Sequence, residues 1–351
     1  MFYFRLSSNI KDITEKIIHY TDGSYSLLPA ELRHLYNLSF EWQSLKELSD
    51  KDIEVWQLKK LLDKRIVECG CSKSIFPWRA RYYFESQFPL HAKAFPFTKW
   101  LTQPPPKLVW LGLPHNNLVN LRHSTSSGLA SVIDAMPLDS PIIGVLPDST
   151  PNSHCASDII SIAQLAMHCD FKVGILGGDH RATWSFLSVL KQACNIESVF
   201  YIHIDAHHDL YGINDKKEGV QGIYHSNFLL DLLYQHNVDR VCLLGCRDNP
   251  DLINLAQKQG FDIQKVESIP PNNSSMHTHL SIDIDVLDPS YFSGVSSPLG
   301  GGWSVKKLFE VINEVVRTVR VDSISIVEAG SNCPNTIQAV SELSQLLEEI
   351  I

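Results

Sequence analysis

The chain has 351 residues and a net charge of −9, with 44% hydrophobic and 20% charged residues. This composition is ordinary for a globular protein with a large core, and the length exceeds that of one typical domain. The negative charge gives no general attraction to nucleic acid or to anionic membranes. No run approaches the roughly 20 apolar residues that a membrane span needs, and no secretory signal precedes the eight scattered cysteines. We therefore expect a cytoplasmic protein with free thiols and no nucleic-acid or membrane partner.

Residues 1–103 carry none of the motifs described below. They end at the prolines of Gln103–Pro106, which favour an extended spacer. Ser49–Asp52 resembles a capping box, and apolar residues at helical spacing follow it between Val55 and Ile66, before a short apolar strand at 65–68. We predict a small, mostly helical accessory domain, with a winged-helix-like unit as one option. Such a domain would decorate the core, contact another subunit or help to hold a peptide.

From residue 107 onward, strand-like and helix-like stretches alternate. This alternation predicts an α/β domain over residues 107–351, in which helices cover both faces of a mainly parallel sheet. The sequence predicts buried strands at 172–176, 198–204, 279–284 and 322–327, and helices at about 181–195, 226–236, 304–319 and 336–350.

Three short polar clusters follow three of these strands. Because the carboxyl ends of parallel strands meet at one rim of a sheet, we expect the clusters to converge. Alternate residues of an extended chain project to the same side, which would bring the ligands within each cluster together. The candidate ligands are His180 in Gly177-Gly178-Asp179-His180, then Asp205, His207 and Asp209, and finally Asp283 and Asp285.

Two imidazoles and four carboxylates suit a pair of hard or borderline divalent ions. The lack of cysteine among them argues against zinc–thiolate or iron–sulfur chemistry. Two ions about 3.5–4 Å apart need bridging carboxylates, and they share a water that yields hydroxide near neutral pH. The alternative, that these are solvated loop residues, would explain one cluster but not three. The pattern predicts a dinuclear metallohydrolase.

The three motifs resemble those of the ureohydrolase family, which includes arginase, agmatinase and formimidoylglutamase. The matching patterns are Gly-Gly-Asp-His, Asp-Ala-His-x-Asp and Ser-x-Asp-x-Asp-x-x-Asp-Pro, and the resemblance covers about residues 107–351. It implies a three-layer arginase-like fold and two Mn²⁺ ions. The family pattern implies that one ion takes His180 and Asp209, the other takes His207 and Asp285, and Asp205 and Asp283 bridge both.

The resemblance also implies roles beyond metal binding. Glu328, after the strand at 322–327, would pair with a guanidinium group, and His225 would protonate the departing amine. We expect Asp209 to act in catalysis as well, and Tyr211 and Asn227 to contact the substrate.

Several positions depart from the family pattern. Arg181 follows His180, and Ser226 follows His225 where the family usually has Gly. Tyr211 stands where members selective for free arginine have an Asn that holds the α-carboxylate, so free arginine is not the expected substrate. We expect the Gly-Cys-Arg-Asp element that ends at Asp248 to be structural.

The resemblance and its departures predict a manganese hydrolase that cleaves a guanidino C–N bond and releases urea. Arginine side chains of a precursor peptide, converted to ornithine, are the expected substrate. Agmatine, another small guanidine and formimidoylglutamate are alternatives. A catalytically silent metal-binding module that binds peptides and a single-zinc deacetylase on a related fold stay open as other classes. The resemblance also suggests a homo-oligomer.

Overall fold

The structure of the chain is a computed structural model. Two compact units divide the chain, one of Met1–Arg79 with Pro96–Pro105 and the other of Ala80–Phe95 with Pro106–Ile351. The predicted domains at 1–103 and 107–351 stay a prediction. The structure describes residues 2–6, 10–13, 17–21, 24–27, 43–44, 47–48, 53, 57, 61, 67–71, 74–75, 106–115, 125–136, 140–145, 156, 159–160, 162–164, 166–167, 170–213, 222–270, 275–292, 294–295, 297–330 and 333–351.

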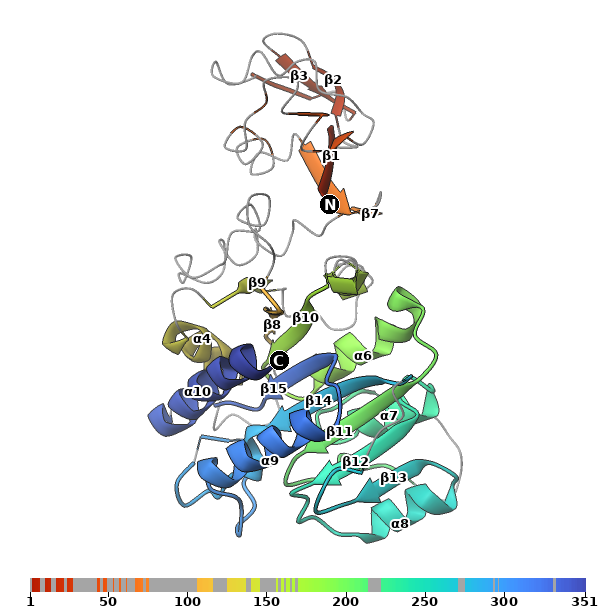
Figure 1. Ribbon diagram of the computed structural model, residues 1–351, viewed down its shortest axis with the longest axis vertical. Coiled ribbons are helices and arrows are strands. Elements are labelled where there is room, and N and C mark those ends of the chain that lie inside the picture. The colour runs from red at the N-terminus through yellow and green to blue at the C-terminus, as the bar shows by residue number, and fades with distance from the viewer. Residues whose placement is uncertain are drawn as a thin grey trace. The chain divides into compact units, whose positions relative to one another are not determined.

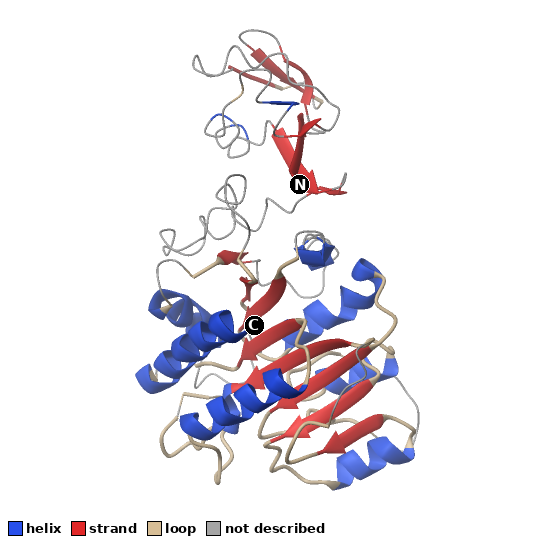
Figure 2. Ribbon diagram, viewed as in Figure 1, coloured by secondary structure: helices blue, strands red, loops and turns tan. Residues whose placement is uncertain are grey.

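The second unit is built on an eight-stranded sheet in which every described strand pair is parallel (Figures 1 and 2). This confirms the expected α/β fold with a mainly parallel sheet. In spatial order, the strands are β13 (Asp262–Lys265), β12 (Arg240–Leu244), β11 (Val199–Ile204), β14 (His277–Asp283), β15 (Ser323–Val327), β10 (Lys172–Gly177), β8 (Leu108–Leu113) and β9 (Ile142–Val145).

Helices cover both faces of this sheet. The helices α4, α9 and α10 share one hydrophobic cluster with the sheet, whereas α6 and α7 pack together on the opposite face. Helix α9 shows why: Leu308, Val311, Ile312 and Val315 recur at helical spacing and are buried, and the Ser304 side chain caps its first turn. The bounds are α4 (Thr125–Ala135), α6 (Arg181–Cys194), α7 (Phe228–Tyr234), α8 (Asp251–Lys258), α9 (Val305–Thr318) and α10 (Pro334–Ile350).

The two faces of the central strands differ in chemistry. Alternate residues of a strand point to opposite faces, and the even-numbered residues of β11, β14 and β15, apart from Thr278, join the apolar cluster with α4, α9 and α10. The odd-numbered residues face α6 and α7 and are mostly polar, yet they are buried. On this polar face lie Tyr201, His203, His279, Ser281, Ser323 and Ser325.

The sequence predicted the four strands and four helices that flank the motifs, with ends that differ by a few residues. It did not predict α4, α8, β9, β12 or β13. These are short elements, and tertiary pairing with neighbours fixes the short outer strands more than local pattern does. Within the described residues, no helix has the length and hydropathy that crossing a membrane requires.

The first unit differs from our expectation of a mostly helical domain, which was wrong for its described residues. These form a four-stranded antiparallel sheet in the order β5-β1-β6-β7 and a three-stranded antiparallel sheet in the order β2-β3-β4. Of the helix expected after Ser49, Ile53, Gln57 and Leu61 are described; all three are buried, and Gln57 and Leu61 are helical, whereas Ile53 is not. The strands are β1 (Phe2–Leu6), β2 (Ile10–Ile13), β3 (Ile17–Tyr20), β4 (Tyr25–Leu27), β5 (Gln43–Ser44), β6 (Val67–Cys71) and β7 (Ser74–Ile75).

The reason for this difference is long-range pairing. Strand β1 pairs along its length with β6, from Phe2 opposite Cys71 to Leu6 opposite Val67. The two partners stand at opposite ends of the segment, so a single short pattern such as Phe-Tyr-Phe-Arg-Leu does not reveal the pairing.

Candidate metal centre and substrate pocket

All three polar clusters lie at the carboxyl-terminal edge of the sheet, as the sequence predicted. His180 follows β10, Asp205 follows β11 directly, and Asp283 is the last residue of β14. The extended geometry expected within the clusters is wrong, however. Strand β11 ends at Ile204, and a 3-10 turn, η4 (Ile284–Val286), begins after Asp283, whose carboxylate accepts a hydrogen bond from the backbone N–H of Asp285.

The imidazoles of His180 and His207 each lie among a cluster of carboxylates, and Asp205 belongs to both clusters. Nδ1 of His180 lies 3.4 Å, 3.2 Å and 3.1 Å from carboxylate oxygens of Asp205, Asp209 and Asp283. Nδ1 of His207 lies 2.9 Å from Asp285 Oδ2 and 3.5 Å from Asp205 Oδ1. Two adjacent groups that share one carboxylate are what a dinuclear centre requires.

The electrostatics show an excess of buried negative charge. Burial disfavours protonation of His180, but the hydrogen bond and charge of Asp209 outweigh it and raise its pKa to about 9. The pKa of His207 rises to about 12, because its bonds to Asp205 and Asp285 outweigh burial. Burial and neighbouring carboxylates raise the pKa of Asp285 to about 6 and that of Asp283 well above its ordinary value. Bound cations would compensate this charge.

The donor set fits two divalent cations. The buried Oδ2 atoms of Asp205 and Asp209 accept no hydrogen bond from the described residues. Buried carboxylate oxygens are costly unless they are paired or coordinate a metal. All six candidate donors are nitrogen or oxygen, which suits hard or borderline ions. The site is therefore a candidate metal centre, as the sequence indicated.

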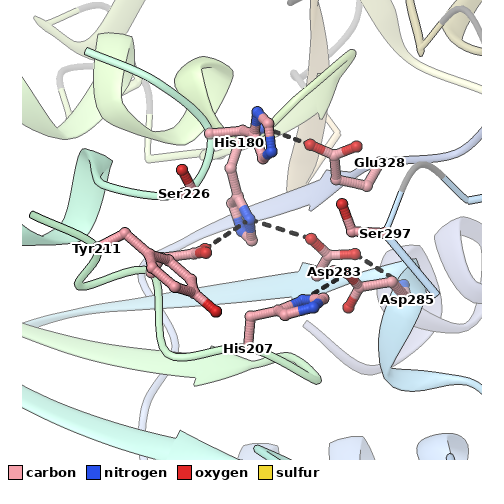
Figure 3. Close-up of a pocket in the computed structure, with 10 residues that line it drawn as sticks. His180, His207, Tyr211, Ser226, Asp283, Asp285, Ser297 and Glu328 are labelled. Carbon is pink, nitrogen blue, oxygen red and sulfur yellow. Dashed lines mark hydrogen bonds and ion pairs between the residues drawn. The ribbon is translucent and has the colours of Figure 1, made fainter. Parts of the chain in front are cut away.

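The ligands open onto a pocket of about 230 Å³. Tyr211 and Ser226 lie on one side of this pocket, and Glu328 and Ser297 lie on the other (Figure 3). Asp205 is not part of the lining, because it lies behind the other ligands and is 1% exposed. The lining residues are His180, His207, Asp209, Tyr211, His225, Ser226, Asp283, Asp285, Ser297 and Glu328.

Glu328 lies in the pocket in a strained backbone conformation. Its φ is 63°, a left-handed value that a glutamate rarely adopts, and its N–H donates to the Gly178 carbonyl at 2.7 Å. The carboxylate is 3% exposed and accepts a bond from the His180 N–H at 3.3 Å. Asp209 is also left-handed, with φ of 52°. Strain of this kind persists where surrounding contacts fix the residue, and it concentrates at functional sites.

The loop that carries His225 also contributes to the lining. His225 and Ser226 are half-buried in the pocket wall, whereas Asn227 does not line the pocket. The Asn227 side chain accepts a bond from the Tyr224 N–H and donates to the Gly222 carbonyl. Asn227 therefore holds the loop in place, and its contact with the substrate stays a prediction.

Tyr211 lies on the same side of the pocket as Ser226, and its N–H donates to the Ser226 carbonyl at 3.1 Å (Figure 3). Its hydroxyl donates to Asp248 at 2.8 Å, and its ring packs against His208 with centroids 5.0 Å apart. Partial burial and the contact with Asp248 raise the pKa of Tyr211 to about 12, so the side chain stays a neutral phenol. The rim at this position offers an aromatic wall.

Two arginines near the motifs have structural partners. Arg181 forms a bidentate ion pair with Asp179, with distances of 2.8–3.0 Å, which satisfies a carboxylate that is not among the candidate ligands. The guanidinium of Arg247 donates to backbone carbonyls, including that of Asp285 at 3.3 Å.

Gly178, in the first motif, cannot be replaced easily, because a Cβ there would lie 1.9 Å from the His115 carbonyl oxygen.

Sequence reasoning missed three residues of this region. Ser226 and Ser297 line the pocket, although the sequence analysis marked Ser226 only as a departure from the family pattern and gave Ser297 no role. His203 is fully buried, and its ring nitrogen lies within 4.8 Å of ligand atoms of His180 and Asp205. The sequence did carry a signal for His203, because His203 stands two residues before Asp205, just as His207 stands two residues after it.

Comparison with known proteins agrees with this site. The chain is 25% identical over 184 residues to an agmatinase of Bacillus subtilis, covering 50% of the chain and 61% of that protein. It is 29% identical over 168 residues to the N(1)-aminopropylagmatine ureohydrolase of Thermus thermophilus, covering 45% of the chain and 54% of that protein. The chain thus spans little more than half the length of these curated relatives.

Solved structures share the fold. The formimidoylglutamase of Bacillus subtilis superposes with a TM-score of 0.55 at 17% identity, covering 71% of this chain and 87% of that one. The arginase of Medicago truncatula gives a TM-score of 0.56 at 19% identity, covering 69% and 86%. In sequence, residues 150–340, more than half of the chain, match the profile of the arginase family. With its strand-end ligands and parallel sheet, this chain therefore belongs to the arginase family.

Proposed function

We propose that the chain is a manganese-dependent hydrolase that cleaves a guanidino C–N bond and releases urea. The observation that carries this proposal is that five of the six candidate donors and Glu328 line one pocket of about 230 Å³, while the sixth donor, Asp205, is buried beside His180 and His207. Membership of the arginase family supports it. Manganese is proposed from the donor set and from the family resemblance.

The proposed roles follow from position. His180 and Asp209 would hold the first cation, His207 and Asp285 the second, and Asp205 and Asp283 both. The bound cations would supply an acidified water as nucleophile. Glu328, on the wall opposite Tyr211, would accept two parallel bonds from a planar guanidinium and so orient its carbon (Figure 3).

His225 is proposed to protonate the departing amine. Its imidazole is half-buried in the pocket wall, and a histidine can exchange a proton near neutral pH. Asn227 supports this role indirectly, because its two side-chain bonds to Tyr224 and Gly222 fix the loop on both sides of His225.

The pocket favours a guanidine whose chain carries no free carboxylate. No lysine or arginine is among the described lining residues, and Tyr211 holds its hydroxyl on Asp248. Arginine within a peptide meets this condition, because its α-carboxyl group is an amide, and we propose it as the first substrate. Agmatine also meets it and is the alternative, supported by the similarity to curated agmatinases. Formimidoylglutamate has two carboxylates and fits less well.

The test is urea release by the manganese-loaded protein with agmatine, free arginine and arginine-containing peptides, whose masses are followed in parallel. Conversion of peptide arginine to ornithine with urea release would support the first proposal. Urea from agmatine alone would establish the alternative. If two ions bind and no urea appears from any guanidine, the proposal of guanidino C–N cleavage fails, and hydrolysis of formimidoylglutamate, which releases formamide, or a silent binding module takes its place. A cytoplasmic location and a homo-oligomer stay predictions.

A further inference from the structure

His203 lies next to the candidate ligands but is not one of the six. Its Nε2 is 3.1 Å from Asp205 Oδ2 and 3.6 Å from Asp209 Oδ2, which are ion-pair distances, and it has no hydrogen-bond partner among the described residues. Its Nδ1 is 3.0 Å from the hydroxyl of Tyr201. The residue is 0% exposed. A buried imidazole held by Tyr201 therefore faces the carboxylates of two candidate ligands.

The partners of His203 fix the direction of its hydrogen bonds. A carboxylate only accepts, so Nε2 must carry the hydrogen that faces Asp205. In the neutral ring Nδ1 is then the acceptor, and the Tyr201 hydroxyl donates to it. Tyr201 thus selects the tautomer that presents an N–H to Asp205. Among the ion pairs of the described residues, His203 Nε2 is the nitrogen nearest to Asp205 Oδ2, because His180 Nδ1 lies farther away, at 3.4 Å.

Tyr201 connects His203 to a second ligand. The Tyr201 hydroxyl is also hydrogen-bonded to Ser281, whose Oγ lies 3.2 Å from Nε2 of His180. Ser325 donates to Ser281 at 2.9 Å and completes its contacts. A continuous set of hydrogen bonds therefore runs from His180 through Ser281 and Tyr201 to His203, and an ion pair at 3.1 Å extends it to Asp205. Every member is at most 1% exposed, so water does not compete for these bonds.

Ring packing holds this set rigid. The His203 ring packs against those of His180, Tyr201 and Phe228, with centroids 5.1 Å, 5.4 Å and 6.0 Å apart. The ring of Phe228 also stacks on His180 at 4.6 Å. Rotation of His203 away from Asp205 would therefore require these neighbours to move.

The set contacts more members of the carboxylate group around His180 than of the group around His207, and the two groups share Asp205. The set contacts His180, Asp205 and Asp209, whereas His207 is oriented by Asp285 and by the other oxygen of Asp205. The His207 side chain is also 16% exposed, unlike the fully buried His203. The two cation positions thus differ in support.

We propose that His203, oriented by Tyr201, is a positioning residue that sets Asp205 and Asp209 for the cation held by His180, and has a smaller effect, through Asp205 alone, on the cation held by His207. The inference rests on the two-cation centre of the proposed function, but not on the identity of the substrate. Outer partners of metal ligands typically change metal affinity by 10–100-fold, roughly, when they are removed.

The test is Mn²⁺ binding to the full chain, measured by equilibrium dialysis, together with electron paramagnetic resonance of the bound ions. We expect two ions in the wild type, with a coupled-pair spectrum. His203→Phe should weaken one ion by roughly 10–100-fold and, at limiting Mn²⁺, show the spectrum of an isolated ion. His203→Gln retains an N–H donor and should restore most of the lost affinity, and Tyr201→Phe should have a smaller effect with the same sign.

The matched control is His279→Phe. His279 is also 0% exposed on the polar face, and its nitrogens bond to Ser323 and Ser325. We expect this variant to retain both ions, and thermal melts show which variants are folded. If His203→Phe and His279→Phe lost both ions to the same extent, the role of His203 would be structural only. Wild-type affinity in His203→Phe would refute the inference, and the same loss in His203→Gln would make His203 a ligand instead.

The same measurements distinguish failure of the His203 inference from failure of the proposed function. Two ions in the wild type with no urea release would defeat the proposal of guanidino C–N cleavage and leave the His203 inference standing. A wild type that binds fewer than two ions would overturn the inference by itself. Thermal melts and urea assays of the same samples assign the failure to one proposal or the other.

Discussion

The two faces of the central sheet use the same strands for opposite purposes. On the face covered by α4, α9 and α10, residues such as Ile202, Leu280 and Ile324 are buried among apolar side chains. On the opposite face, Tyr201, His203 and Ser281 are buried just as deeply but bond to one another and to the ligands. An apolar side chain gains about 1.5–3 kcal/mol on burial, whereas a buried polar group costs free energy unless it is paired. One face stabilises the fold, and the other positions the site.

The largest loss of metal binding and activity is expected when a candidate ligand on the polar face is replaced. Asp205→Asn retains the Oδ1 acceptor that bonds the His207 N–H at 2.6 Å but removes the charge shared by both groups. We expect metal affinity to fall more than for an outer partner, by at least about 100-fold, and urea release to fall to background. Metal analysis and the urea assay check this. Full activity of the folded variant would contradict the dinuclear site.

The apolar face is tested by Ile282→Ala. Ile282 is fully buried in the cluster with α9 and α10, and its truncation should cost about 2–5 kcal/mol of unfolding free energy. Denaturant unfolding measures this loss. Mn²⁺ affinity of the folded fraction should stay near the wild-type value, since the side chain points away from the ligands. A selective loss of one ion would break the division between the two faces.

The stability of the metal-free protein should depend on pH, because the imidazoles of His180 and His207 on the polar face have raised pKa values. The pKa of His180, raised to about 9 by Asp209 and other carboxylates against the effect of burial, exceeds its ordinary value of 6.5. A raised folded-state pKa contributes stability that is fully present below pH 6.5 and lost as pH rises through 9. His207, with a pKa of about 12, acts in the same direction.

We therefore expect the protein in excess chelator to melt at a lower temperature at pH 9 than at pH 6.5. Added Mn²⁺ should narrow this difference, because the bound cations favour the deprotonated imidazoles. Thermal scans at the two pH values, with and without metal, measure it. An equal or higher melting temperature at pH 9 in chelator would show that the carboxylates do not hold the protons of these imidazoles.

The smallest expected effect tests the second layer of the polar face. Ser325 accepts from Thr183 at 2.8 Å, donates to Ser281 at 2.9 Å and bonds His279 at 3.1 Å. Ser325→Ala leaves these partners unsatisfied, at a cost of about 1–3 kcal/mol. Denaturant unfolding checks the loss, and Ser325→Thr, which retains the hydroxyl, is the control. No loss of stability would mean that the network on this face adds little beyond the ligands themselves.

Much of the second unit was predictable from local sequence. The strands before His180, Asp205 and Asp283 are short apolar runs, and α9 and α10 show clear helical periodicity. The first unit was not predictable in the same way, because β1 depends on a partner at Val67–Cys71. The same limit applies to Asn227, which stands next to the pocket residues in sequence but turns its amide to Gly222.

The sequence by itself determined the donor types and the rim at which they meet, because parallel strands bring their carboxyl ends to one edge. It could not determine which neighbours share a bond across strands. Tyr201, His203 and Ser281 become one bonded set only when β11 and β14 pair in register, with Ile202 opposite Leu280. Tertiary structure alone decided that Arg181 pairs with Asp179 and that His203 faces Asp205. The physical reason is that hydrogen bonds and ion pairs depend on distances of a few tenths of an ångström, which only packing can set.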